Sequence, residues 1–188
     1  MTELLVENII AAANIHQQIP LETLIETFPD ATYEKDEQPV LILRYDDPKR
    51  AVFILSDGTI FCTGTTSLFG AKEIIKPVLD SIEENGISFD RYTPIDIHTI
   101  TASCTIAESL DLDLVEECLS EEQVMYEKGQ SPWLEYQLSE QITALIFSSG
   151  KLILTGQTTL TEMKAILMSL IDTLTLKGAI EKKEEEHA

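Results

Sequence analysis

The stretch Leu145 to Thr158 reads LIFSSGKLILTGQT, and the earlier stretch Phe53 to Thr66 reads FILSDGTIFCTGTT. In each, two apolar runs flank a short turn that contains glycine, and Thr-Gly closes the second run. Glycine accepts the positive φ angle that tight hairpin turns require. Each stretch therefore predicts a β-hairpin, and the repetition predicts a chain built from two similar halves.

An amphipathic helix is predicted after each hairpin. Its apolar residues recur at i, i+3, i+4, i+7, i+8 and i+11, a spacing that places them on one stripe of a helix. Gly86 and Gly178 are the predicted helix stops, and Pro77, on the outer face of the first helix, is expected to kink or break it. The two apolar stripes and the two glycine stops differ by a constant 92 positions between the halves. The stripes are Ala71, Ile74, Ile75, Val78, Leu79 and Ile82 in the first half, and Met163, Ile166, Leu167, Leu170, Ile171 and Leu174 in the second.

The remaining segments predict the same order in both halves: a strand, a short helix, four strands and a long helix. The segment IHTITASCTI, from Ile97, aligns with VENIIAAANI, from Val6, and Tyr126-Glu127-Lys128 repeats Tyr33-Glu34-Lys35. We therefore divide the chain into a first repeat at residues 1–92, a second repeat at residues 93–180, and an acidic tail at residues 181–188 that we expect to be disordered.

Ten strands and four helices predict an α+β fold in two layers. Alternation along the hairpin strands places Thr59, Phe61 and Thr63 on one sheet face, with Lys151, Ile153 and Thr155 as their equivalents. If Ile60 and Cys62 face the helices, the opposite face is apolar and uncovered, and such a face usually binds a partner. The alternative is that the two halves fold their sheets together and bury this face.

Composition limits the classes of function. The chain of 188 residues carries 33 acidic and 13 basic residues, a formal charge of −20, which opposes non-specific attraction to nucleic acid or anionic membrane. Adaptation to high salt is one explanation for this charge. No apolar run approaches the roughly 20 residues of a membrane span, and the N-terminus lacks a signal-peptide pattern. Cys62, Cys104 and Cys118 cannot all pair, so we expect a reduced, cytoplasmic protein with no membrane partner.

No catalytic pattern stands out. His16, His98 and His187 show no metal-ligand spacing with one another or with the cysteines, and Asp46-Asp47 is typical of a turn. A phosphate-binding loop, zinc spacing and nucleophile elbow are all missing from the sequence. We therefore expect neither enzymatic activity nor a cofactor or metal.

Taken together, these segments resemble the TATA-box-binding protein family over nearly the whole chain. VENIIAAANI is similar to the first-strand motif of the family, and LIFSSGKLILTG is similar to its most recognisable segment. The resemblance implies a pseudo-two-fold saddle of two direct repeats. Its ten-stranded curved antiparallel sheet would lie with the concave face on an opened minor groove, and its four helices on the convex face would bind other transcription factors.

The resemblance also implies DNA-binding residues. Asn8 matches the central asparagine of the first repeat, and Thr99 stands at the equivalent place in the second. Arg44 and Lys49 match phosphate contacts, while Phe147 matches one of four phenylalanines that wedge into base steps. The full implied set is Asn8, Ile10, Arg44, Lys49, Leu55, Phe61, Thr63, Thr99, Thr101, Pro132, Phe147, Lys151, Ile153 and Thr155.

Several family residues are replaced. Leu55 replaces the wedge partner in the first repeat, Gln38 and Ser131 stand where the other two phenylalanines belong, and Gln137 replaces the second-repeat arginine. Each lost phosphate contact removes nearly one unit of salt dependence. We therefore expect DNA affinity to be weakened or altered.

The expected function is that of a general transcription factor that recognises A/T-rich promoter DNA and acts with a transcription factor B-like protein. The alternative is a paralogue that does not bind DNA and whose apolar face binds a peptide, a helix or other transcription factors. A homodimer through the concave face is a further expectation, because an uncovered apolar sheet needs shielding.

Overall fold

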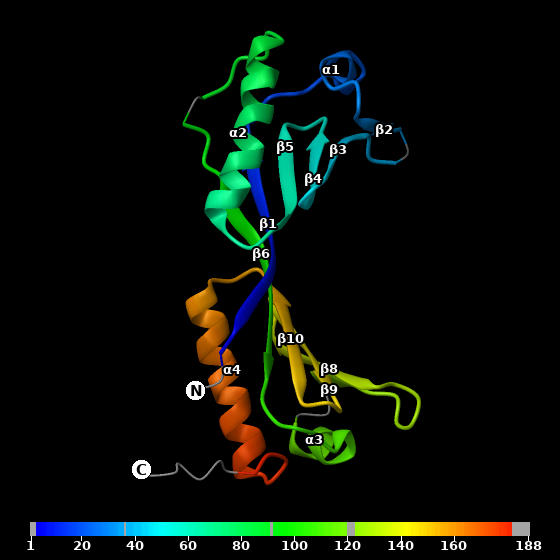
Figure 1. Cartoon of the computed structure of the whole chain (residues 1–188), viewed down its shortest axis with the longest axis vertical. Helices are drawn as coiled ribbons and strands as arrows, with labels where there is room; N and C mark the ends of the chain where they lie inside the picture. Colours follow the sequence, from blue (N-terminus) through cyan, green and yellow to red (C-terminus); the bar gives the residue numbers. More distant parts are fainter. Residues whose placement is uncertain (1–2, 36, 91, 120–122, 182–188) are drawn as a thin grey trace. The chain divides into compact units, whose positions relative to one another are not determined.

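The computed structural model describes residues 3–35, 37–90, 92–119 and 123–181 (Figure 1). The predicted tail lies outside the described residues beyond Glu181. The described ranges contain ten strands and four α-helices, which confirms the α+β class. The elements are β1 (Leu5–Asn14), α1 (Leu21–Leu24) with a 3-10 turn (Ile25–Thr27), β2 (Thr32–Glu34), β3 (Val40–Asp46), β4 (Lys49–Leu55), β5 (Thr59–Thr65), α2 (Leu68–Glu84), β6 (Asp96–Thr105), α3 (Leu112–Cys118), β7 (Val124–Met125), β8 (Trp133–Ser139), β9 (Ile142–Phe147), β10 (Lys151–Gly156) and α4 (Leu160–Leu176).

All ten strands belong to one sheet in the order β2-β3-β4-β5-β1-β6-β10-β9-β8-β7. The alternative of two sheets folded together is therefore wrong. The chain divides into two compact units, which we call the first unit (Glu7–Thr99) and the second unit (Met1–Val6 with Ile100–Ala188). Each unit is described by itself below.

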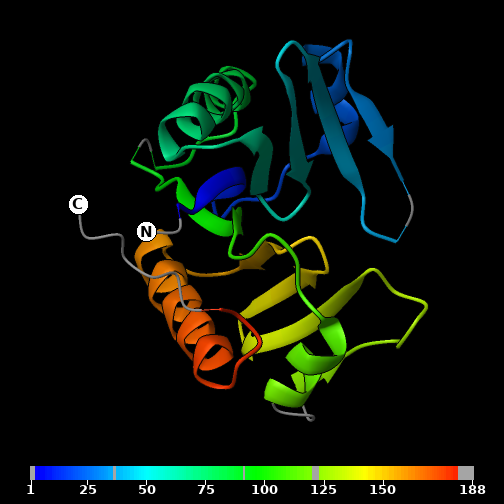
Figure 2. The same cartoon turned by 60° about the horizontal axis from the view of Figure 1, so that its bottom comes forward.

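In the first unit, α2 covers one face of the strands (Figure 2). Its buried stripe is the six residues predicted from the periodicity, Ala71 to Ile82. The strand residues Val52, Ile54, Ile60 and Cys62 are fully buried, whereas their neighbours Phe53 and Phe61 remain half-exposed. The helix runs unbroken through Pro77, so a break there is excluded.

In the second unit, α3 and α4 contribute to a single hydrophobic core with the strands. Met163, Leu167, Leu170 and Leu174 of α4 are buried, while Ile166 and Ile171, also on the predicted stripe, are only partly buried. The core continues into the strands through Ala144, Ile146, Leu152 and Leu154, and into α3 through Val115. As in the first unit, alternate strand residues on the other face stay half-exposed.

Each hairpin turn is tied to the segment that follows the first strand of its unit. In the first unit Ile15 N–H donates to the Gly58 carbonyl oxygen at 3.0 Å. In the second, Ile106 N–H donates to the Gly150 carbonyl oxygen at 2.9 Å. Gly150 has φ +77°, and a Cβ there would overlap the Ala107 carbonyl. Glycine is therefore required both for the turn and for this close approach.

The helix ends confirm the predicted stops. Gly86 and Gly178 have φ angles of +85° and +84° directly after the caps of α2 and α4. At the start of α4, the Thr159 hydroxyl accepts from Glu162 N–H, and the Glu162 carboxylate accepts from Thr159 N–H. The carboxylate accepts from Thr159 N–H and from the hydroxyls of Thr158 and Thr159, and these three hydrogen bonds lower the pKa of Glu162.

The repeats differ at the first edge strand that follows the short helix. In the first unit Thr32 pairs with Ile42, and in the second Met125 pairs with Glu135, which is the equivalent register. However, β7 ends at Met125, so Tyr126, Glu127 and Lys128 follow the strand, whereas Tyr33 and Glu34 lie within β2. The repetition in sequence is therefore not matched by an identical strand.

The three cysteines are free and buried. Burial raises the pKa of the Cys62 thiol, and it raises the pKa of Cys104 to about 11. Both thiols therefore stay protonated near neutral pH and are poor nucleophiles. Within the described ranges no helix is long and apolar enough to cross a bilayer.

Substitution of the hairpin glycine Gly150 should lower the free energy of unfolding more than substitution of Gly178. Gly178 has the same left-handed backbone as Gly150, but a Cβ there meets nothing within 4 Å. Gly178→Ala should therefore cost only the left-handed strain, about 1 kcal/mol. Gly150→Ala should cost about 3 kcal/mol, because the hairpin must also move away from Ala107. Urea unfolding of both variants tests this, and equal losses would contradict it.

Candidate nucleic-acid interface

The sheet face opposite the long helix of each unit is called its open face. In the first unit, Asn8 on β1 lies on this face beside Thr63 of β5. Its Nδ2 donates to Thr63 Oγ1 at 3.0 Å, and its Oδ1 accepts from Gly64 N–H at 2.8 Å. An amide carries two N–H donors and two acceptor lone pairs. Asn8 is thus held in place while it keeps hydrogen-bonding capacity for a ligand.

A basic pocket of about 340 Å³ adjoins Asn8 in the first unit. Arg44 on β3 and Lys49 on β4 line it together with Asn8 and Thr63. Arg44 Nη1 donates to Thr32 Oγ1 at 3.1 Å, which orients the guanidinium. Asp46 also lines this pocket, and its backbone pairs with Lys49. Arg50 lines the pocket as well, so one carboxylate lies among three cationic side chains.

An apolar groove of about 550 Å³ also lies in the first unit, and we call it the first-unit groove. The ring of Phe61 meets the ring of His98 edge to face, with centroids 5.7 Å apart. Gln38, at the place of a wedging phenylalanine in the resembled family, is exposed at this groove. The lining residues are Ile10, Gln38, Val40, Phe53, Leu55, Phe61, Cys62, Thr63, His98 and Thr99.

Threonines mark the open face of the second unit. Thr101 on β6 pairs in register with Thr155 on β10, and their hydroxyl oxygens are 3.2 Å apart. Thr155 is the equivalent of Thr63, whereas Thr101 is the equivalent of Ile10 and Thr99 that of Asn8. Ile153, on the same strand face, is half-exposed.

An aromatic pair lies further along the second unit. Trp133 on β8 is the register partner of Phe147 on β9, and their ring centroids are 6.1 Å apart. Pro132 is exposed beside it, and its carbonyl oxygen accepts from Ser148 N–H. Lys151 is exposed at the start of β10. Sequence reasoning missed Trp133; the signal was its position opposite Phe147 once β8 and β9 are aligned.

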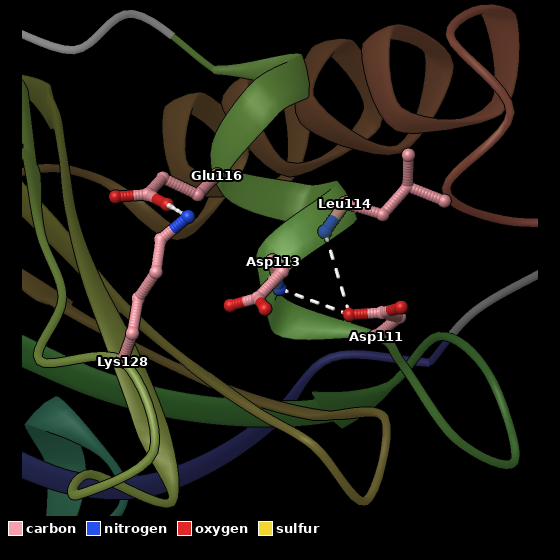
Figure 3. Close-up of polar contacts among 5 residues, drawn as sticks. All are labelled: Asp111, Asp113, Leu114, Glu116 and Lys128. Carbon is pink, nitrogen blue, oxygen red and sulfur yellow. Dashed lines mark hydrogen bonds and ion pairs between the residues drawn. The ribbon is translucent and has the colours of Figure 1, made fainter.

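The loop after β7 is fastened to α3 in the second unit (Figure 3). Lys128 Nζ lies 2.8 Å from Glu116 Oε2, and this carboxylate raises the pKa of Lys128. The Asp111 carboxylate caps α3 by accepting from Asp113 N–H and Leu114 N–H. Lys128 is thus paired with an acid, while Glu127 beside it is exposed.

The structure brings the implied residues into separate groups. In the first unit, Asn8, Arg44, Lys49 and Thr63 share the basic pocket. Ile10, Leu55, Phe61, Thr63 and Thr99 share the first-unit groove. In the second unit Thr101 and Thr155 touch, whereas Phe147 contacts Trp133, a residue outside the implied set. Among the described residues, no group of histidines, cysteines and acidic residues could hold a metal ion.

The repeats and the sheet define a class of protein: a two-repeat α+β chain in which each repeat ends in a long helix. A model of the family described as "Transcription factor TFIID (or TATA-binding protein, TBP)" matches residues 3–85 and 94–176. The chain belongs to the TATA-box-binding protein family, a family of general transcription factors.

Relatives match over nearly their whole length. TATA-box-binding protein F of Halobacterium salinarum is 31% identical over 94% of this chain and 95% of its own. The TATA-box-binding protein of Pyrococcus abyssi is 31% identical over 98% of this chain and 96% of its own. Among solved structures, Methanococcus jannaschii TBP superimposes with a TM-score of 0.80 at 30% identity, covering 93% of this chain and 99% of that one.

The Asn8 contacts predict a measurable stability effect. Asn8→Ala removes the bonds to Thr63 and Gly64 and should lower the free energy of unfolding by about 1–2 kcal/mol. Asn8→Asp keeps an acceptor for Gly64 N–H but loses the donor to Thr63, so it should cost less than alanine. Urea unfolding at neutral pH compares the two. A loss for alanine no larger than that for aspartate would contradict the hydrogen-bonding role.

Proposed function

We propose that this chain is a general transcription factor that recognises A/T-rich promoter DNA in the minor groove through its open faces. The observation that carries the proposal is the basic pocket beside Asn8. Although the chain has a formal charge of −20, Arg44 and Lys49 line one pocket together with Asn8 and Thr63. This combination suits a phosphate beside a base edge. The names of the relatives, TATA-box-binding proteins, support the same reading.

The chemistry of the open faces suits A·T pairs. In the minor groove these pairs present only acceptors, adenine N3 and thymine O2. The Asn8 amide and the hydroxyls of Thr63, Thr101 and Thr155 can donate to such atoms. The groove-floor residues Ile10 and Ile153 are half-exposed and apolar, so they can lie against base edges without leaving polar groups unpaired.

The affinity is proposed to be weaker than the fold alone would allow. Gln38 and Ser131 cannot fill an opened base step, and Gln137 donates to the Ser139 carbonyl oxygen at 2.5 Å instead of offering a cation. Bending DNA costs about 1–10 kcal/mol, which contacts must repay. Few cations and the −20 charge work against this, although high salt would screen the repulsion.

A transcription factor B-like protein is the proposed partner, because a second protein on the same duplex would add the contacts that this chain lacks. The exposed Glu127, next to the Lys128–Glu116 ion pair, is the proposed docking position. Homodimerisation through the open faces is proposed for the free protein, since these faces are apolar. Sedimentation at several concentrations tests it, and a monomer throughout would exclude it.

Salt dependence measures the phosphate contacts directly. Lys49→Gln should weaken binding to an A/T-rich duplex and reduce the slope of log K against log salt by about 1 unit. Lys164→Gln makes the same charge change on an exposed residue of α4 and should leave the slope unchanged. Gel shifts across a KCl series supply both slopes. Equal slopes would remove Lys49 from the interface, and no shift at any salt would reject DNA binding.

Joint recruitment gives a second test of the function. A transcription factor B-like protein should convert a weak shift into a stable ternary complex on promoter DNA, because the two proteins share the cost of bending. Glu127→Lys should reduce ternary assembly without changing the binary shift. Electrophoresis of both complexes measures this. A ternary complex that forms equally well with Glu127→Lys would exclude the proposed docking position.

The first-unit groove favours a second candidate function, a protein-interaction module. The groove measures about 550 Å³ and its lining is mostly apolar. Such a groove suits the apolar face of a helix or peptide. This function would replace DNA binding if A/T-rich duplexes fail to bind at every salt concentration.

A further inference from the structure

An exposed pair of aromatic rings in the second unit has no explanation in the core. Trp133 is 43% exposed, and its ring lies 6.1 Å from the Phe147 ring at an angle of 48°. The sequence neighbours Leu134 and Ile146 are fully buried. Because side chains alternate across a strand, both rings lie on the open face. Rings that are register partners on this face are well placed to receive a flat partner.

The first unit has nothing similar at the equivalent place. There, Val40 is the register partner of Leu55. The two phenylalanines of this face, Phe53 and Phe61, pair with each other and line the first-unit groove. At this place the two units therefore present different chemistry: aliphatic side chains in the first, and paired rings in the second.

The backbone holds Trp133 in position. Ser131 Oγ donates to the Trp133 carbonyl oxygen at 2.7 Å and lies 3.3 Å from Trp133 N–H. Ser148 N–H donates to the Pro132 carbonyl oxygen on the other side. Ser131 stands at the position of a wedging phenylalanine in the resembled family, and its hydroxyl holds the main chain of Trp133. A backbone held in this way loses little conformational entropy when the ring that it carries binds.

We infer that Trp133 is a stacking residue of the DNA interface, and this rests on the proposed function. With Phe147, Trp133 packs against an unstacked base step and supplies the ring that is missing at Ser131. Stacking of a base on an aromatic ring is sequence-tolerant and strong enough to change affinity about 10–100-fold. At this pair of register positions only the second unit carries two rings, so one end of the DNA site is opened by rings and the other is held by charge.

Intrinsic fluorescence tests the inference because Trp133 is the only tryptophan in the chain. Titration with an A/T-rich duplex should quench its emission in parallel with the anisotropy of an end-labelled duplex. Placing 2-aminopurine at each end step in turn should show unstacking at one end only. Trp133→Ala should weaken binding about 10–100-fold, and Trp133→Phe should restore most of it. Phe69→Ala, which removes an exposed aromatic side chain of α2, should shift affinity less than twofold.

The outcomes separate this inference from the proposed function. If the duplex binds while Trp133 emission stays unchanged and Trp133→Ala binds normally, the inference is overturned and DNA binding stands. If no duplex binds at any salt, both are overturned. Trp133 and Phe147 could also simply stabilise the strand pair, so urea unfolding accompanies each variant. Should Trp133→Ala fail to fold, the unaltered protein decides the question: quenching of its Trp133 emission by the duplex supports the inference, and unchanged emission overturns it.

Discussion

One-sided burial of the sheet is the constraint on which the rest of the structure depends. In each unit the long helix lays one apolar stripe on one face, so alternate strand residues are fully buried, as Ile54 and Leu152 are. The residues between them, such as Phe53 and Ile153, remain half-exposed. Because a strand alternates strictly, the helices that build the core also create the open face. The candidate interface is therefore a direct consequence of how the core is formed.

Two glycine turns hold this arrangement at the hairpin ends. Gly58 and Gly150 allow the hairpins to approach the backbone that follows β1 and β6 so closely that no side chain fits. The resulting hydrogen bonds recur in both units with nearly identical lengths. Duplication is thus visible in backbone contacts as well as in apolar spacing. The turns fix the ends of the strands, and with them the positions of Leu55 and Phe147 on the open faces.

Local periodicity was sufficient to predict much of the fold. The helix stripes, the hairpins and the glycine stops depend on residues close in sequence, and the structure places them within a residue or two of their predicted positions. Contacts across strands were not accessible in the same way. The Trp133–Phe147 pair, the Asn8–Gly64 bond and the approach of Asp46 to Lys49 depend on register, which a one-residue slip would change. The early end of β7 and the unbroken helix at Pro77 likewise depend on tertiary context.

The proposed DNA contacts are divided unequally between the units, and this bears on how the protein would act. The first unit combines Asn8 with Arg44 and Lys49 but presents aliphatic residues where a wedge is needed. The second presents Trp133 and Phe147 together with the threonine pair Thr101 and Thr155, and it has Gln137 in place of a cation. Neither set alone could repay the cost of bending DNA. Tethering in one chain makes the second binding event intramolecular, so two weak and chemically different halves can still select one orientation on an A/T-rich site.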